Sequence, residues 1–549
     1  MQTRRRFSTA GLAALAGAVG LGACRAAEPA APVKPGGTVP TGTGPSDSIP
    51  YGPVPEADAP DVPAGMATAG SDWSPPADRA VHVANRLTFG LTPEVLAAIR
   101  QAGVAVWVDE QLQPDRHVDP PELTATLAAL PTLQLDAAEL AGLLGDGGSR
   151  PASVAAETVA ATIARQHWRS AQLHEVMVEF WTNHFAMDLF SGPLRVLKPI
   201  DDREVIRPHA LGRFADLLAA SAQSPAMLVS LDNARSRAGA INENYGRELL
   251  ELHTVGVDGG FTEADVVAAA NTLTGFTVER GSARFTFDAA RHDERPQQVL
   301  DWRSPAGLDG HRVGLSLLDH LAHHPATARH LATKLAIRFV SDEPDPALVA
   351  TLAEVYLAND TAIDAVLRAL VADERFFTTA TAKFRRPHEL LLAALRGLDG
   401  GLDAAKAGAL AAPGAGRTDR VGAFGAALRS MGQLPMSWPS PDGFPDVATA
   451  WRNPGALLTR WNTLADLVAG ELTPAHVDLG RLLGAATLPA GPLLDAVADR
   501  VFGIALTAGE RDALLSGAGV AVDTPVATGS STARTLVALL LATPRFQYR

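Results

Sequence analysis

The residues best suited to chemistry in the first half of the chain lie in one short stretch, EFWTNHF, from Glu179 to Phe185. At helical spacing, His184 falls on the apolar stripe that Met177 and Phe180 form, so its imidazole is expected to point into the protein interior. A buried imidazole needs a partner, which is a carboxylate, a backbone carbonyl or a metal ion. His184 is therefore either a hydrogen-bonded core histidine or, with Asn183, part of a site.

A second polar run, NYGRELLELH, extends from Asn244 to His253. In a helix, Glu248 and Glu251 share a face, and Arg247 and Glu251 are spaced for an ion pair. His253 lies near the end of this helix, where the helix dipole favours a charged imidazole. One interpretation is a salt-bridged amphipathic helix without chemistry.

The functional interpretation of the same run is a site built from imidazoles and carboxylates. Such side chains suit a divalent metal cofactor or, alternatively, an acid–base pair. The spacing differs from His-Glu-x-x-His, so a zincin-type protease is not expected. The candidate metal ligands are His184, Glu248, Glu251 and His253.

A third candidate is the loop SWPSPDGFPD, from Ser437 to Asp446. Its prolines enforce a conformation that cannot pack as a helix, and such loops often line sites. The alternative is a rigid cover over the core, with Asp446 capping the next helix. The candidate catalytic residues are His184, Asn183, Glu248 and Asp442. The histidines His320, His323, His324 and His330 are interpreted as surface or capping residues.

Several enzyme classes lack their motifs in this chain. It contains no Gly-x-Ser-x-Gly elbow, P-loop or dinucleotide fingerprint, which argues against serine hydrolases, NTPases and NAD enzymes. The one cysteine, Cys24, lies at a predicted processing site, so any metal in the mature body must use His and carboxylates.

The N-terminus resembles an export signal. Arg4 and Arg5 precede Phe7 in a twin-arginine pattern, and a short apolar run leads to the lipobox-like Leu21–Cys24. We expect residues 1–24 to be a lipoprotein signal peptide, with Cys24 as the lipid-anchored residue. The alternative is a plain signal peptide and a periplasmic or secreted protein. Residues 25–76 are rich in Pro and Gly and are expected to be a disordered tether.

Composition predicts an all-α protein. Hydrophobic residues make up 47% of the 549 residues, with Ala, Leu and Val dominant, and helical periodicity recurs over ranges such as 151–190 and 243–255. Only residues 276–288 alternate like a β-hairpin. We expect 77–549 to form one large helical body. The net charge of −13, without a basic stripe, excludes nucleic acid as an expected partner and leaves the membrane, through the lipid anchor, and an envelope protein.

Segments spread along the body carry a family resemblance. They include RLTFGLTPE (86–94), EFWTNHF (179–185), NYGRELLELHTVGVDGGFTEADV (244–266), HPATARHLATKLAIRFV (324–340) and SPDGFPDVATAWRNPGALLTRWN (440–462). In this order they resemble the bacterial family called domain of unknown function 1800. The resemblance implies an exported envelope protein and assigns no reaction. This leaves two hypotheses: an envelope enzyme, hydrolytic or oxidative, or a non-catalytic scaffold whose polar groups only satisfy one another.

Overall fold

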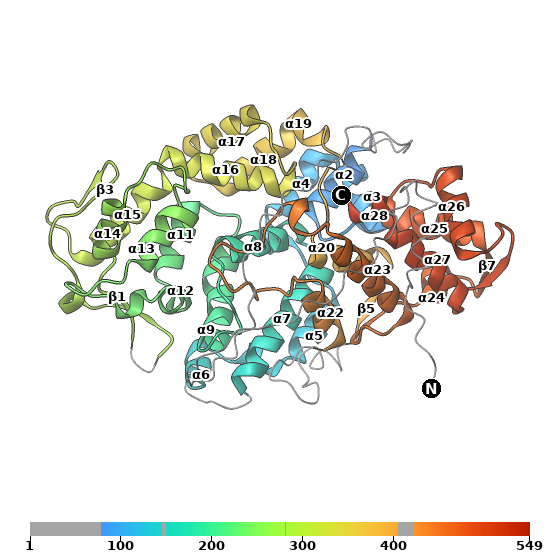
Figure 1. The fold of residues 1–549 in the computed structure, drawn as a ribbon, viewed down its shortest axis with the longest axis horizontal. Coiled ribbons are helices and arrows are strands. Elements are labelled where there is room, and N and C mark those ends of the chain that lie inside the picture. The colour runs from blue at the N-terminus through green and yellow to red at the C-terminus, as the bar shows by residue number, and fades with distance from the viewer. Residues whose placement is uncertain (1–77, 145–149, 280–281, 381, 404–421) are drawn as a thin grey trace, which may run out of the picture. The chain divides into compact units, whose positions relative to one another are not determined.

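The computed structural model describes residues 78–144, 150–279, 282–380, 382–403 and 422–549. All of them belong to a unit that extends from Pro75 to Arg549. The predicted signal peptide with Arg4, Arg5 and Cys24, and the predicted tether over 25–76, lie outside the described residues. The expected all-α fold is confirmed, because helices dominate the unit (Figure 1).

The helices follow one another closely along the chain, and many of them begin with a proline in the first turn or an Asp, Asn, Ser or Thr cap. The first half contains α2 (Arg79–Leu87), α3 (Pro93–Ala102), α4 (Val104–Gln111), α5 (Pro121–Ala128), α6 (Ala137–Ala141), α7 (Arg150–Trp168), α8 (Gln172–His184), α9 (Leu194–Asp201), α10 (Arg207–His209), α11 (Phe214–Ala222), α12 (Pro225–Ser230), α13 (Asn244–Glu248) and α14 (Glu263–Thr272). The second half contains α15 (Gly310–Ala322), α16 (Pro325–Phe339), α17 (Pro346–Ala358), α18 (Ile363–Ala372), α19 (Glu374–Phe377), α20 (Pro387–Gly397), α22 (Ala423–Ser430), α23 (Pro454–Ala469), α24 (Leu479–Leu483), α25 (Ala490–Phe502), α26 (Ala508–Ala518), α27 (Ser531–Ala542) and α28 (Pro544–Gln547).

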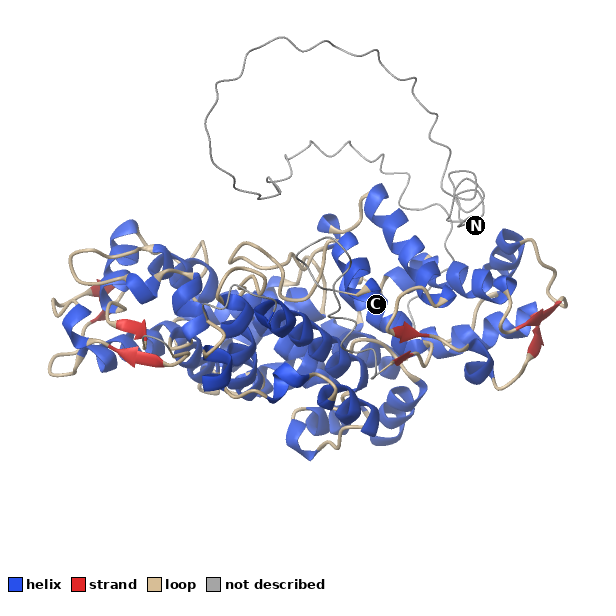
Figure 2. Ribbon diagram, turned by 90° about the horizontal axis from the view of Figure 1, so that it is seen from below, coloured by secondary structure: helices blue, strands red, loops and turns tan. Residues whose placement is uncertain are grey.

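The sheets are small. The predicted hairpin is confirmed as β1 (Phe276–Val278) and β2 (Phe285–Phe287), which are antiparallel with Phe276 opposite Phe287. Three further antiparallel pairs among the described residues were not predicted; they are visible with the hairpin in Figure 2. They are β3 (Gln298–Val299) with β4 (Trp302–Arg303), β5 (Gly401–Leu402) with β6 (Ala475–His476), and β7 (Thr487–Pro489) with β8 (Pro525–Ala527).

The helical pattern predicted over 151–190 is wrong as one continuous helix. It divides into α7 and α8, and α8 ends at His184. Beyond this end the backbone bonds to a distant segment, because the Leu189 N–H donates to the Met436 carbonyl at 2.8 Å. This contact ties the end of α8 to the loop that contains Asp442.

The pattern predicted over 243–255 begins as α13 and continues as a π-helical turn over Leu249–His253. A π-turn is rare and is often found at functional sites. It changes the direction of the last side chains relative to an α-helix, and His253 is buried.

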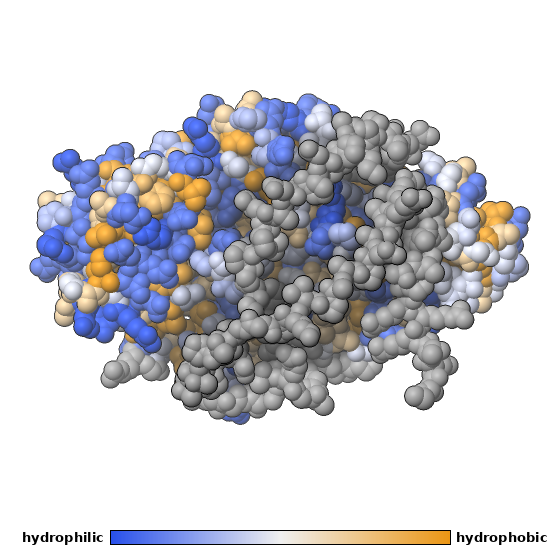
Figure 3. Space-filling view, in the orientation of Figure 1, coloured by the Kyte–Doolittle hydropathy of each residue, from blue (hydrophilic) through white to orange (hydrophobic). Residues whose placement is uncertain are grey.

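The core consists of Ala, Leu, Val and Phe side chains from nearly all the helices. In Figure 3, hydrophilic and hydrophobic residues are interspersed over the described surface of that face. None of the described helices combines the length and apolar character needed to cross a membrane.

Candidate functional site

His184 lies at the last position of α8 and points inward, as predicted. Only 1% of the residue is exposed, and its ring contacts the rings of Phe185 and Trp181, with centroids 4.7 and 5.4 Å away. Trp181 holds this end of α8 in place, because its indole N–H donates to the Ala210 carbonyl at 2.9 Å.

Both ring nitrogens of His184 have partners. Nδ1 accepts a hydrogen bond from the Lys334 ammonium at 2.9 Å, and Nε2 lies 3.2 Å from the His253 carbonyl oxygen. Since a carbonyl can only accept, the proton of the neutral ring is on Nε2. Burial, and next the charge of Lys334, hold the pKa of His184 well below its usual value, so the imidazole is neutral at pH 7.

Lys334 was not among the candidates from the sequence. It lies on α16, with His330 one turn before it and Arg338 one turn after it on the same face. No carboxylate side chain of the described residues pairs with its ammonium; the hydrogen bond it makes is to His184. Burial lowers the pKa of Lys334 to about 8, against the opposing charges of Asp442 and Asp446.

His330 was interpreted as a surface or capping residue, and this is wrong. It is partly buried, its Nε2 lies 3.3 Å from the Leu252 carbonyl, and its ring centroid is 6.3 Å from that of His184. The repeat of His330, Lys334 and Arg338 at one-turn spacing was the sequence signal for this cluster. His324, in contrast, caps α16 as expected, accepting from the Ala326 N–H.

The prediction that the helix dipole favours a charged His253 is wrong. The residue is buried, neither ring nitrogen has a hydrogen-bond partner among the described residues, and burial lowers the pKa to about 3. Burial outweighs the dipole because the dipole contributes at most about 2 kcal/mol. The predicted pair of Arg247 with Glu251 is also wrong: the guanidinium binds Glu263 at 2.6 Å and lies 3.8 Å from Glu243.

Glu248 and Asp442 approach this cluster without contacting His184. Burial raises the pKa of Glu248, and the neighbouring charges of Glu251 and Asp442 raise it further. The Asp442 carboxylate accepts a hydrogen bond from the Trp438 indole at 2.8 Å. Glu248, Asp442 and Lys334 are thus within electrostatic range of one another.

The proposed metal ligands do not form a metal centre as placed. Among the described residues, no group of three or more His, Cys, Asp or Glu side chains is arranged to hold a metal ion. The nitrogen of His184 that would bind a metal already accepts from the Lys334 ammonium, and Nε2 is used by the His253 carbonyl. The arrangement suits proton transfer between an amine and an imidazole better than metal ligation.

Asn183 fixes the loop over Ser437–Asp446 to α8. Its amide group donates to the Phe444 carbonyl at 2.9 Å and accepts from the Phe444 N–H at 2.7 Å. Gly443, at a φ of +77°, lies so close that a Cβ there would overlap the Asn183 carbonyl oxygen. Asn183 is therefore a positioning residue for the loop that contains Asp442.

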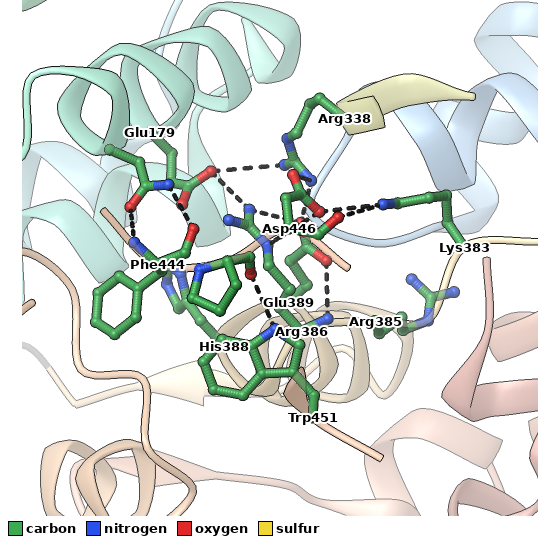
Figure 4. Close-up of polar contacts among 12 residues, drawn as sticks. Glu179, Arg338, Lys383, Arg385, Arg386, His388, Glu389, Phe444, Asp446 and Trp451 are labelled. Carbon is green, nitrogen blue, oxygen red and sulfur yellow. Dashed lines mark hydrogen bonds and ion pairs between the residues drawn. The ribbon is translucent and has the colours of Figure 1, made fainter. Parts of the chain in front are cut away.

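A buried network of charged side chains lies beside this loop (Figure 4). Glu179 binds Arg386 at 2.7 Å, and Glu389 binds both Arg338 and Arg386. Asp446 lies 3.3 Å from the Lys383 ammonium. The suggestion that Asp446 caps the next helix is wrong, because the cap of α23 is Asn453.

A small pocket lies on the opposite face of α8 from His184. Its volume is about 30 Å³, room for about two water molecules. Of the candidate catalytic residues it includes Asn183, but not His184, Glu248 or Asp442. The lining residues are Thr162, Gln166, Val178, Glu179, Thr182, Asn183, Ala186, Met187, His388, Gln433, Pro435, Met436, Trp438 and Phe444.

Comparison with known families identifies the chain as a whole. The family model described as "Protein of unknown function (DUF1800)" matches residues 82–548, so the chain belongs to this family. No curated protein and no solved structure shows significant similarity to it.

Proposed function

We propose that this protein is an exported, lipid-anchored envelope enzyme that performs hydrolysis by general acid–base catalysis. The observation that carries the catalytic part is the 2.9 Å contact between the Lys334 ammonium and the Nδ1 atom of His184. It is an amine bound to an imidazole, without a carboxylate partner among the described side chains. This arrangement supports a lysine that releases and accepts protons near neutral pH.

The electrostatic environment supports two complementary roles. Burial lowers the pKa of Lys334 to about 8, and burial raises that of Glu248, so both groups are moved toward neutrality. Catalytic acids and bases are most effective when their pKa lies near the working pH. We assign the Lys334 amine as the base that takes a proton from water, and protonated Glu248 as the acid toward the leaving group.

His184 would keep Lys334 in position and share its proton. The His253 carbonyl holds the Nε2 tautomer, which leaves Nδ1 free to accept from the amine. Asp442 stabilises the charged lysine, because its carboxylate raises the pKa of Lys334. Asn183 acts indirectly, through the loop.

The export part of the proposal rests on the N-terminal residues. The motif around Arg4 and Arg5 and the Leu21–Cys24 sequence support twin-arginine export followed by lipidation. Replacing both arginines by Lys should trap precursor in the cytoplasm, and Cys24→Ala should release the protein from the membrane fraction. Unchanged fractionation of both variants would contradict this part.

The experiment for the catalytic part is a screen of the full-length protein against chromogenic acyl, phosphate and glycosyl esters. Lys334→Met and His184→Gln should each lower kcat by about 100-fold or more while the thermal midpoint stays within a few degrees. The matched control is Arg329→Met, at an exposed position of the same helix. Full activity in the Lys334→Met variant would refute the assignment.

A second candidate function is a non-catalytic scaffold in the envelope. The observation that favours it is the size of the pocket beside Asn183, which at about 30 Å³ admits two waters and no substrate as it stands. For a scaffold, His184→Gln should lower stability, and no substrate of the screen should be turned over.

A further inference from the structure

The pocket beside Asn183 contains polar atoms that lack partners. Gln166 and His388 line it and are each 1% exposed, and the Gln166 Oε1 and His388 Nε2 atoms make no hydrogen bond within the described protein. The hydroxyl of Thr182, also in the lining, has no partner among the described residues either. Unsatisfied buried groups are costly, so three of them around one cavity indicate a polar occupant.

The chemistry of the lining indicates a neutral occupant. The Glu179 carboxylate is compensated by Arg386 at 2.7 Å and Arg338 at 3.7 Å, as Figure 4 shows, so it does not supply a free negative charge for a cation. Burial lowers the pKa of His388 to about 4, which keeps its imidazole uncharged. The unpartnered groups are an amide oxygen, a hydroxyl and a neutral imidazole, which together donate to and accept from hydroxyl groups.

The other wall of the pocket is aromatic and fixed. The rings of Trp438 and Phe444 lie 4.9 Å apart, and the Trp438 indole is held by Asp442 at 2.8 Å. Phe444 is held by both polar atoms of the Asn183 amide. A partly exposed indole that is already oriented suits stacking against a flat, weakly polar ligand face at low entropic cost.

We propose that this pocket binds a neutral hexopyranose. Two ring hydroxyls would replace the two waters that the cavity can hold, bonding to Gln166, Thr182 and His388, while the C–H face of the ring stacks on Trp438. The site uses neither Lys334 nor His184, so the inference does not rest on the proposed catalysis.

The test is calorimetric titration of the full-length protein with glucose, galactose and N-acetylglucosamine, with putrescine as a cationic probe. At least one sugar should bind with a Kd on the order of 1 mM and quench tryptophan fluorescence. Thr182→Val, which keeps the shape and removes the hydroxyl, should weaken binding about tenfold, and Trp438→Ala should abolish it. Trp168→Ala, a partly buried tryptophan outside the pocket, is the control and should bind normally.

Three results would overturn the proposal. The first is the absence of saturable binding by all three sugars to the folded wild-type protein. The second is unchanged sugar affinity in Thr182→Val, which decides the matter even where Trp438→Ala does not fold. The third is putrescine binding that is lost in Trp438→Ala, since it would show a cation site instead.

Discussion

Lys334 differs from the other lysines that the structure describes. Lys198 binds the Asp201 carboxylate at 2.5 Å and Lys383 binds that of Asp342 at 2.6 Å, whereas Lys334 binds an imidazole nitrogen. A carboxylate partner stabilises the ammonium form, and an uncharged imidazole does so less. The difference in partner, together with burial, gives Lys334 its reactive character.

We predict that Lys334 reacts with amine acylating reagents at lower pH than an ordinary lysine. The free amine is the reactive form, and with a pKa of about 8 it forms more than two pH units below the usual value of 10.5. Acetylation of Lys334, followed by mass spectrometry, should be half-maximal near pH 8. Asp442→Asn should move this midpoint lower still, because the carboxylate of Asp442 raises the pKa. A midpoint near that of a lysine reference peptide would contradict the prediction.

At the same scale, the sequence predicted part of the site. The inward direction of His184 followed from its position on an apolar stripe, and the need for a ring partner followed from burial. The identity of that partner did not, because Lys334 is 150 residues away in the chain and only tertiary packing brings it within 2.9 Å. The charge state of His253 was missed because the dipole argument assumed an exposed helix end.

At the scale of elements, helices and the β1–β2 hairpin were predictable because each has a repeating pattern. The other strand pairs have two or three residues each, which is too short for a periodic signal. The break between α7 and α8 was missed since the apolar pattern continues across it. The π-turn over Leu249–His253 follows helical periodicity too closely to be distinguished from an α-helix.

The loop over Ser437–Asp446 is held by contacts that tolerate little change, and we predict that Gly443→Ala is strongly destabilising. A Cβ there meets the Asn183 carbonyl oxygen, and the φ of +77° is unfavourable for alanine. Gly470→Ala is the matched control, because its φ is +79° with open space around the Cβ. In urea unfolding, the control should lose about 1–2 kcal/mol, and Gly443→Ala about 3 kcal/mol or more. Equal losses would show that the loop does not press on α8.

At the scale of the whole unit, a buried charge network joins elements that are distant in sequence. Glu389 of α20 contacts Arg338 of α16, Arg386 and Arg549, and Arg386 also contacts Glu179 of α8. Removing one partner of such a network leaves a buried charge uncompensated, at a cost of about 3–5 kcal/mol. The network therefore favours joint unfolding of these helices.

The buried histidines add a second property of the whole unit, which is sensitivity to acid. Burial lowers the pKa of each of them far below 6.5, so the folded protein keeps them neutral where the unfolded chain would be protonated. They are His82, His167 and His253, with pKa values of about 3, and His330 and His388, with values of about 4.

We therefore predict that the free energy of unfolding decreases steeply as the pH falls from about 6.5 toward 4. In this range the unfolded state binds more protons than the folded state, so stability rises with pH, by up to about 1.4 kcal/mol per pH unit for each such histidine. Burial opposes ionisation of Glu175 and Glu389, but neighbouring arginines hold the pKa of both carboxyls well below the usual value, which adds a loss of the same sign below about pH 4.5. The measurement is urea unfolding at pH 7, 6, 5 and 4.5. Replacing His253 by Gln should reduce the slope by up to one proton, and a flat profile in the wild-type protein would contradict the assignment of these histidines as buried and neutral.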